Sequence, residues 1–202
     1  MLPSFIEEYE LNDKSICNAL LGLYQEGYKR GLTNDGVVGD SDTVDHSTKK
    51  SVDFPMQEAG KLGPAEMFKW PDYHTELCGF IDQYLEKYQT LKFAGKLEMK
   101  QLPQIQCYKP GDGFYKWHCD GTQLSCDRAL VYMTYLNDVP DGGTEFMHQE
   151  ITTKAVKGKT VIWPAGLTYT PWTNSKRRYK IYYHRMALVG QHKIRGKQCQ
   201  LM

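Results

Sequence analysis

Between residues 108 and 121 the chain reads Tyr108-Lys109-Pro110-Gly111-Asp112-Gly113-Phe114-Tyr115-Lys116-Trp117-His118-Cys119-Asp120-Gly121. Pro110 to Gly113 are typical of a turn, and the aromatic residues that follow favour a strand. Along a strand, residues i and i+2 point to the same side, so His118 and Asp120 can face one metal ion. An imidazole and a carboxylate with open coordination positions are what a non-haem Fe(II) site needs. On its own, a His-x-Asp pair is more often a hydrogen-bonded surface pair.

The composition is that of an ordinary globular domain. The 202 residues fit one domain with a substantial core, and the hydrophobic share is 41%. Lys and Arg total 25 against 24 acidic residues, which gives no electrostatic reason to expect a nucleic acid or an anionic membrane as partner. No apolar run approaches the roughly 20 residues that span a bilayer. We expect a cytoplasmic protein with no membrane partner.

Cysteine usage agrees with a reducing compartment. Six cysteines are scattered without a C-x-x-C pair, and the amino terminus lacks the pattern of a secretion signal. We expect free thiols. Cys119 lies between the two candidate ligands and is expected on the opposite face of the strand, as a small buried hydrophobe rather than a third ligand.

The first 93 residues are expected to be mainly helical. Asn12 or Asp13 can cap a helix that ends at Gly31, and a second helical pattern runs from Gly63 to Leu91, with its main part starting near Asp72. Between them, residues 32 to 60 are polar and show little periodicity. Two readings remain for this flexible loop: a solvated surface loop, which the pattern slightly favours, and a flap over a site.

Residues 94 to 189 read as short strands separated by turns. The expected strands are Ile105 to Tyr108, Phe114 to His118, Arg128 to Leu136, Thr144 to His148, Thr152 to Val156, Lys159 to Trp163 and Arg178 to Val189. This pattern predicts an α+β protein, mainly β: a sandwich or jelly roll with the two amino-terminal helices on one sheet. Residues 190 to 202 are expected to be a solvated tail, and the absence of repeats predicts a single domain.

Five blocks occur in order along this region: Tyr108-x-x-Gly111-x-x-Phe114-x-x-x-His118-x-Asp120, Tyr135-Leu136-Asn137-Asp138, Gly142-Gly143-Thr144-Glu145-Phe146, Lys157-Gly158-Lys159 and Trp163-Pro164-Ala165-Gly166. In type and order they resemble the blocks of the 2-oxoglutarate- and Fe(II)-dependent oxygenases, in particular the prolyl 4-hydroxylase-like group. The similarity extends from about Asp13 to Val189. It implies a double-stranded β-helix, that is, a jelly roll.

The resemblance also implies roles for individual residues. His118 and Asp120 would be iron ligands. Tyr108 would hydrogen-bond the distal carboxylate of 2-oxoglutarate, and Arg178 would pair with the same carboxylate, a task that suits its planar fork. Lys180, on the same face of the expected strand, is the fallback for Arg178.

One position departs from the group's pattern. Where the group has a histidine after Pro-Ala-Gly-x-Thr, this chain has Tyr169. Three outcomes are open: Tyr169 binds iron as a phenolate in a His-Asp-Tyr triad, it turns away and leaves a two-ligand site, or iron and catalysis are both lost. A free phenol has a pKa of about 10, so ligation requires the metal to displace its proton. Such a hard anionic ligand would favour a resting Fe(III) state.

The expected function is oxidation by dioxygen. The resemblance implies an enzyme that uses Fe(II), 2-oxoglutarate and dioxygen, with ascorbate as a candidate reductant, to hydroxylate a C–H bond of a peptidyl proline or another amino-acid side chain. The alternative is a non-catalytic jelly-roll domain that binds a metal or ligand without turnover. A nucleic-acid substrate is disfavoured by the net charge of +1.

Overall fold

A computed structural model describes residues 3–39, 43–95, 97–99, 102–121, 127–140, 142–166, 168–172 and 185–194. Arg178 and Lys180 therefore lie outside the described residues. Its longer helices are α1, Ser15–Lys29, and α2, Trp70–Lys87; three 3-10 helices are η1, Met56–Lys61, η2, Ala65–Phe68, and η3, Gln89–Ala94. In the described part of the chain, no helix has the length and apolar character needed to cross a membrane.

Both expected helices are confirmed. In α1, the Oδ1 atom of Asp13 accepts the Ser15 N–H at 2.9 Å near the start, and Gly31 adopts a φ of 69° just beyond the end. Helix α2 begins at Trp70, two residues before the expected start, because Pro71 is tolerated in the first turn of a helix. Each helix buries one apolar stripe: Ile16, Cys17, Leu20, Leu23 and Tyr24 in α1, and Tyr73, Leu77, Phe80, Ile81 and Tyr84 in α2.

Eight strands of the described residues form the main sheet. They are β1, Glu7–Glu10; β2, Asn34–Asp35; β3, Val52–Pro55; β4, Leu97–Glu98; β5, Gln104–Tyr108; β6, Arg128–Tyr135; β9, Lys159–Pro164; and β11, Arg185–Ile194. Their order is β1-β9-β6-β11-β5-β3-β2, with β4 paired to β11, and the pairs are antiparallel. The expected strands at β5, β6 and β9 are confirmed to within one residue.

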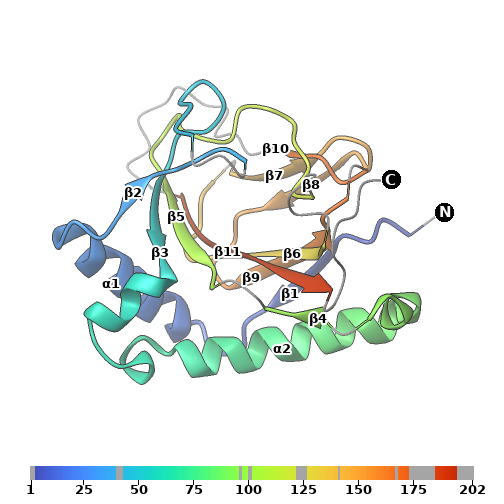
Figure 1. The fold of residues 1–202 in the computed structure, drawn as a ribbon, viewed down its shortest axis with the longest axis horizontal. Helices are drawn as coiled ribbons and strands as arrows, with labels where there is room; N and C mark the ends of the chain where they lie inside the picture. The colour runs from blue at the N-terminus through green and yellow to red at the C-terminus, as the bar shows by residue number, and fades with distance from the viewer. Residues whose placement is uncertain are drawn as a thin grey trace.

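A smaller sheet packs on one face of the main sheet. It has the order β10-β7-β8, with β7, Gly143–Phe146; β8, Ile151–Lys154; and β10, Pro171–Trp172. The phenol of Tyr135 on β6 lies 2.9 Å from the hydroxyls of Thr144 and Thr153, which ties the two sheets together. We call the face of the main sheet toward this small sheet the inner face. Figure 1 shows α1 and α2 along the opposite face.

Side chains alternate between these two faces along the central strands. Leu130, Tyr132 and Ile162 join the core under the helices, whereas Val131, Met133, Val161 and Trp163 join a second core on the inner face with Phe146 of β7. Such alternation follows from the period of two along a strand. The main sheet is therefore buried on both sides.

The stretch 32–60, expected to be a loop, contains β2, β3 and part of η1. Thr48, Lys49 and Ser51 are buried within it. Val52 to Pro55 pair with β5, which supplies the partner strand that the local sequence does not reveal. Much of this stretch is therefore part of the main sheet or lies directly against it.

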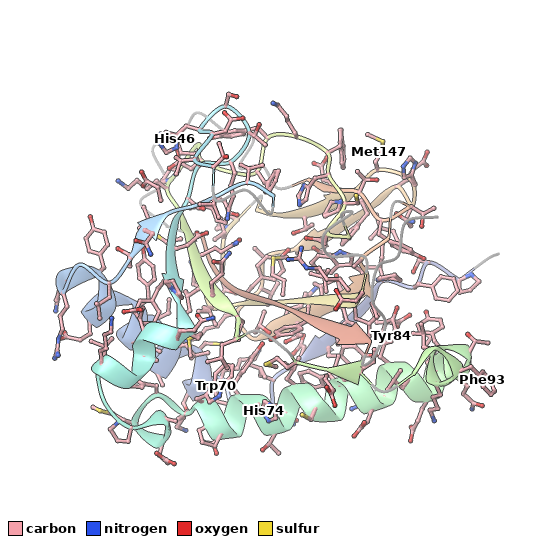
Figure 2. All side chains as sticks on the ribbon, in the orientation of Figure 1. His46, Trp70, His74, Tyr84, Phe93 and Met147 are labelled. Atoms are coloured by element: carbon pink, nitrogen blue, oxygen red, sulfur yellow. The ribbon has the colours of Figure 1, made fainter. Side chains whose placement is uncertain are left out.

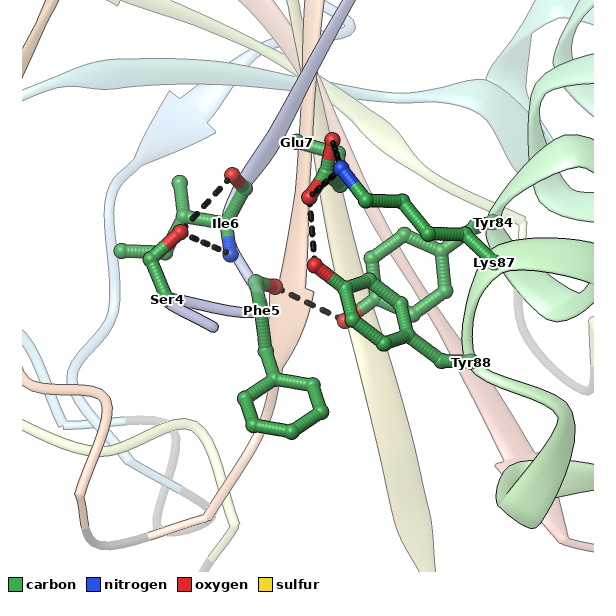
Figure 3. A network of polar contacts seen from close by, with 7 residues as sticks. All are labelled: Ser4, Phe5, Ile6, Glu7, Tyr84, Lys87 and Tyr88. Atoms are coloured by element: carbon green, nitrogen blue, oxygen red, sulfur yellow. Dashed lines mark hydrogen bonds and ion pairs between the residues drawn. The ribbon is translucent and has the colours of Figure 1, made fainter. Parts of the chain in front are cut away.

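The amino-terminal strand is fixed to α2 by polar contacts (Figure 3). Glu7 accepts hydrogen bonds from Lys87 at 2.8 Å and from Tyr88 at 2.5 Å, and Tyr84 donates to the carbonyl of Phe5 at 2.8 Å. The Phe5 ring also lies 4.6 Å from the ring of Tyr88. These contacts hold β1 at the edge of the sheet next to β9.

Candidate metal and cosubstrate site

The segment that carries the His-x-Asp motif is irregular. The strand expected from Phe114 to His118 is wrong, because this stretch forms a single bridge, between Phe114 and Lys49, in place of a strand. The Tyr115 N–H donates to the Thr48 carbonyl at 2.7 Å, and the Gly113 carbonyl accepts the Lys50 N–H at 2.9 Å. The aromatic residues favour a strand locally, but the backbone of this segment is hydrogen-bonded to Thr48 and Lys50, in the short stretch before β3.

The other end of the segment is attached to β9. The Gly121 N–H donates to the Ala165 carbonyl at 2.7 Å, directly after β9. A Cβ atom at position 121 would lie 3.0 Å from that same carbonyl oxygen, so the approach suits glycine. Figure 2 places His46 and Met147, which flank this region in two different loops, at the end of the molecule opposite α2. The motif is therefore supported by two parts of the chain that are far apart in sequence.

Two contacts fix the orientation of the His118 ring. Its ring stacks on Phe114 with centroids 3.7 Å apart and planes at 13°, and its Nδ1 lies 3.1 Å from the Lys116 carbonyl. With the Nδ1 proton donated to that carbonyl, Nε2 keeps its lone pair. A neutral imidazole held in this way is the usual protein ligand for a divalent metal.

Asp120 is half-buried, and its Oδ2 atom lies inside the protein. Burial raises the pKa of its carboxyl group above the ordinary value, while His118, Trp163 and Arg128 act in the opposite direction. Arg128 also donates to the Asp120 backbone carbonyl at 2.8 Å. A bound cation offsets the cost of burying a carboxylate charge. Metal binding by His118 and Asp120 together stays a prediction.

Tyr169 lies in a different set of contacts. Its side chain is half-buried against the inner-face core, and its backbone N–H donates to Gly166 at 3.0 Å. Burial raises the pKa of its phenol. Desolvation is the main cause of the raised pKa of Tyr84 and of Tyr88, and Tyr169 is only a minor contributor to each. Ligation of a metal by Tyr169 stays a prediction.

Within the described residues, no three His, Cys, Asp or Glu side chains come together as a metal site. A third protein ligand beside His118 and Asp120 would therefore have to be another residue type, such as Tyr169, or a residue outside the described ranges. The two residues present fit a metal centre with open positions, since they provide one nitrogen and one oxygen donor.

Tyr108 lies at the end of β5 on the inner face. It is buried, and its hydroxyl donates to Gln106 Oε1 at 2.9 Å. The predicted partner cation, Arg178, lies outside the described residues. The cosubstrate roles of both residues stay predictions.

Several polar residues near this site were not predicted from the sequence. Trp163 and Arg128 surround Asp120, and buried Lys49 and Asp53 pair on the face that carries Tyr108. Trp163 opens the Trp163-Pro164-Ala165-Gly166 block and follows the Lys157-Gly158 turn. Its place at the end of a strand could therefore have been predicted from the sequence. No pattern in the sequence predicts that Lys49 is buried, because a single lysine in a polar stretch is ordinarily exposed.

Comparisons with known proteins support the family resemblance. Residues 103–193 match the family model described as the 2OG-Fe(II) oxygenase superfamily. No curated protein sequence matches the chain.

Several solved structures share the fold. A Pseudomonas putida prolyl-4-hydroxylase is 16% identical with a TM-score of 0.64, covering 95% of this chain and 94% of that one. A prolyl hydroxylase from Trichoplax adhaerens, in complex with a hypoxia inducible factor peptide fragment, is 11% identical with a TM-score of 0.69, covering 94% and 83%. A viral collagen prolyl hydroxylase from Paramecium Bursaria Chlorella virus-1 is 16% identical with a TM-score of 0.60, covering 95% and 97%. The chain thus has the fold of these enzymes over nearly its whole length, and its residues 103–193 match the 2OG-Fe(II) oxygenase superfamily.

Proposed function

We propose that the protein is a 2-oxoglutarate- and Fe(II)-dependent oxygenase that hydroxylates a C–H bond, and that its two sheets form the double-stranded β-helix of such enzymes. The observation that carries this proposal is the His118-x-Asp120 segment, which has a fixed imidazole and a carboxylate with one buried oxygen, inside the region that matches the oxygenase superfamily. Fold alone would not be enough, because one fold can host many functions.

The residues have distinct roles in this proposal. His118 through Nε2 and Asp120 through its carboxylate would hold the iron, with Tyr169 as the proposed third ligand. Tyr108 and Arg178 would hold the distal carboxylate of 2-oxoglutarate. When bound, iron and 2-oxoglutarate supply the activation of dioxygen, with release of succinate and CO2. Ascorbate would return an Fe(III) resting state to Fe(II).

The apolar inner-face core provides the other requirement, which is exclusion of water. Val131, Met133 and Val161 are buried there, and Trp163 lies between this core and Asp120. A dry surrounding strengthens the attraction between Asp120 and a cation and protects reactive species from side reactions.

For the substrate we propose a peptide or protein, with a peptidyl proline or another amino-acid side chain as the oxidised group. The support comes from the structural neighbours: the three described above are prolyl hydroxylases, and one of them is in complex with a peptide fragment. The net charge of +1 agrees with a substrate that is not a nucleic acid.

The third ligand can be tested directly by replacing Tyr169 with Phe. The protein is loaded with Fe(II) without oxygen, and its visible absorption is recorded before and after exposure to air. A phenolate bound to Fe(III) gives a charge-transfer band, so we expect a band that appears on oxidation in the wild type and is missing in Tyr169→Phe. The same band in both proteins would contradict ligation by Tyr169.

The alternative function, a binding domain without turnover, is favoured by one observation. Tyr169 is half-buried and packs against the inner-face core, as an aromatic residue without a ligand role would do. If the iron-loaded wild type shows no band, retains no iron and forms no succinate from 2-oxoglutarate, this alternative holds. Succinate formation without a band would mean that catalysis proceeds with Tyr169 off the metal.

A further inference from the structure

A charged pair is buried beneath the polar stretch that precedes β3. The Lys49 ammonium lies 2.7 Å from Asp53 Oδ2, and both residues are nearly inaccessible, at 3% and 4% exposed. Lysine is almost never fully buried unless it is paired. Replacing a buried ion pair by apolar residues often leaves a protein equally stable or more so, and a pair in this position therefore suggests a role other than stability.

The pair lies on the inner face of the main sheet, beside Tyr108. Asp53 on β3 is directly opposite Gln106 on β5, and Tyr108 follows two residues later on the same face. Their neighbours Phe54 and Cys107 point the other way, into the core under the helices. The hydrogen bond from Tyr108 to Gln106 and the pair from Lys49 to Asp53 thus form one polar cluster.

The charge of Lys49 persists at neutral pH. Burial acts to lower the pKa of its ammonium, but Tyr108 and Asp53 raise it, and the net shift is upward. Asp53 pairs with Lys49 and lies opposite Gln106, which accepts the hydrogen bond of the Tyr108 hydroxyl, so the ammonium and the phenol belong to one polar cluster.

The cluster has hydrogen-bonding capacity to spare. Within the described part of the chain, Asp53 is the one side chain that accepts a hydrogen bond from the Lys49 ammonium, which has three N–H donors. Ser51 Oγ and Asp53 Oδ1 are buried without a hydrogen-bond partner among the same residues. Unsatisfied buried polar atoms are uncommon in folded proteins and call for an explanation, of which a ligand is one.

We propose that Lys49, held in place by Asp53, is a further positioning residue for the distal carboxylate of a 2-oxo dicarboxylic acid, which it binds together with Tyr108. The inference rests on the proposed function and extends it to a residue of the amino-terminal half. Ammonium groups and phenolic hydroxyls are both donors that a carboxylate accepts.

The test compares two ligands that differ only at the distal end. Binding of 2-oxoglutarate and of 2-oxopentanoate, which ends in a methyl group, is measured by calorimetry on the Mn(II)-loaded protein. We expect Lys49→Met to raise the Kd for 2-oxoglutarate by roughly 10- to 100-fold, the loss typical of a hydrogen bond to a charged group. The Kd for 2-oxopentanoate should change by less than about twofold, since this ligand makes no such bond. Lys49→Arg should keep most of the affinity.

Lys50→Met is the matched control. Lys50 is an exposed neighbour that pairs with Asp112 at 3.1 Å, and its loss should change neither Kd. If Lys49→Met does not fold because Asp53 is left unpaired, Lys49→Met/Asp53→Leu removes both charges and is measured in its place.

Two results would overturn the assignment. An equal loss of affinity for both ligands in Lys49→Met would show that Lys49 has a merely structural role. Unchanged affinity for both ligands would show that Lys49 has no role in binding. If the wild type with metal binds neither 2-oxo acid, the proposed function fails and this assignment fails with it. If the wild type binds both 2-oxo acids and Lys49→Met loses the same affinity for each, the assignment of Lys49 fails while the proposed function stands.

Discussion

At the scale of single residues, the surroundings of His118 and Asp120 prepare them for a metal in different ways. Stacking on Phe114 and the contact with the Lys116 carbonyl fix the orientation of the imidazole. Asp120 is instead affected by burial, which raises the pKa of its carboxyl group. If both residues bind a metal as proposed, the fixed imidazole would reduce the cost of ordering ligands on binding.

The first prediction concerns His118. We expect His118→Ala to weaken Mn(II) binding by more than about 100-fold, because loss of a partner that only orients a ligand already costs about 10- to 100-fold. Isothermal calorimetry measures the affinity. The control is His148→Ala, which removes an exposed histidine at the β7–β8 turn and should leave Mn(II) binding unchanged. Equal affinity in the two variants would contradict a role for His118 as a ligand.

At the scale of elements, the His-x-Asp segment depends on the stretch before β3 and on the end of β9. Asp45 closes a turn in that stretch by accepting hydrogen bonds from Ser47 at 2.9 Å and Thr48 at 2.6 Å, and these contacts lower the pKa of its carboxyl to about 2. The Thr48 carbonyl then binds Tyr115. The motif is therefore placed by backbone hydrogen bonds from other elements, in contrast to a motif on a continuous strand.

Gly121 offers a test of this placement. In Gly121→Ala the new methyl group would lie 3.0 Å from the Ala165 carbonyl oxygen, so the segment has to move away from the end of β9. We expect a loss of about 1 to 3 kcal/mol in the free energy of unfolding, as for other overpacked sites, and weaker Mn(II) binding. Urea denaturation and calorimetry measure the two effects.

Gly166→Ala is the matched control for that substitution. A Cβ atom at Gly166, in the same turn after β9, has no heavy atom within 4 Å. This variant should keep both stability and metal affinity. If Gly121→Ala behaves like Gly166→Ala, the contact between the motif and β9 does not position Asp120.

At the scale of the whole molecule, stability comes from two cores separated by the main sheet. Cys17 of α1 is buried in the core under the helices, with its Sγ 3.9 Å from the Tyr135 carbonyl on β6. Burial raises the pKa of this thiol to about 11. The thiol thus reports on the packing of α1 against the sheet.

Alkaline pH should lower the stability of the protein through Cys17. The thiol ionises near pH 9 in the unfolded chain but only near pH 11 in the folded one, so the unfolded state binds fewer protons between these values. The free energy of unfolding therefore falls as pH rises across this window, by up to roughly 2 to 3 kcal/mol from this group. Guanidinium denaturation at several pH values should show that the free energy of unfolding falls less steeply with pH in Cys17→Ala than in Cys78→Ala. The second variant removes an exposed thiol. Parallel declines in the two variants would contradict this account.

The sequence predicts the parts of the fold that depend on local pattern. Strands β5, β6 and β9 and both long helices follow from the spacing of apolar residues and from turn residues such as Gly31 and Gly158. The strand expected at Phe114 was wrong because its backbone groups bind Thr48 and Lys50, about 65 residues earlier in the chain. Burial of Lys49 depends likewise on the pairing of β3 with β5, which no local pattern reveals.

The candidate site, like the fold, was predicted from the sequence only in part. The segment that carries His118 and Asp120 is held by hydrogen bonds from distant segments and not by the expected strand, and the role of both residues as metal ligands stays a prediction. For Tyr169 the residue type alone leaves its ligation open, because a phenol can satisfy its hydroxyl in several ways. The structure places its side chain against the inner-face core.

The most direct measurement of the central claim is succinate formation from 2-oxoglutarate by the purified protein with Fe(II) and air. The account predicts succinate from the wild type, none when iron is removed, and none from His118→Ala, while His148→Ala stays at the wild-type level. An absence of succinate from the iron-loaded wild type, or equal amounts from His118→Ala, would contradict an oxygenase centred on His118 and Asp120.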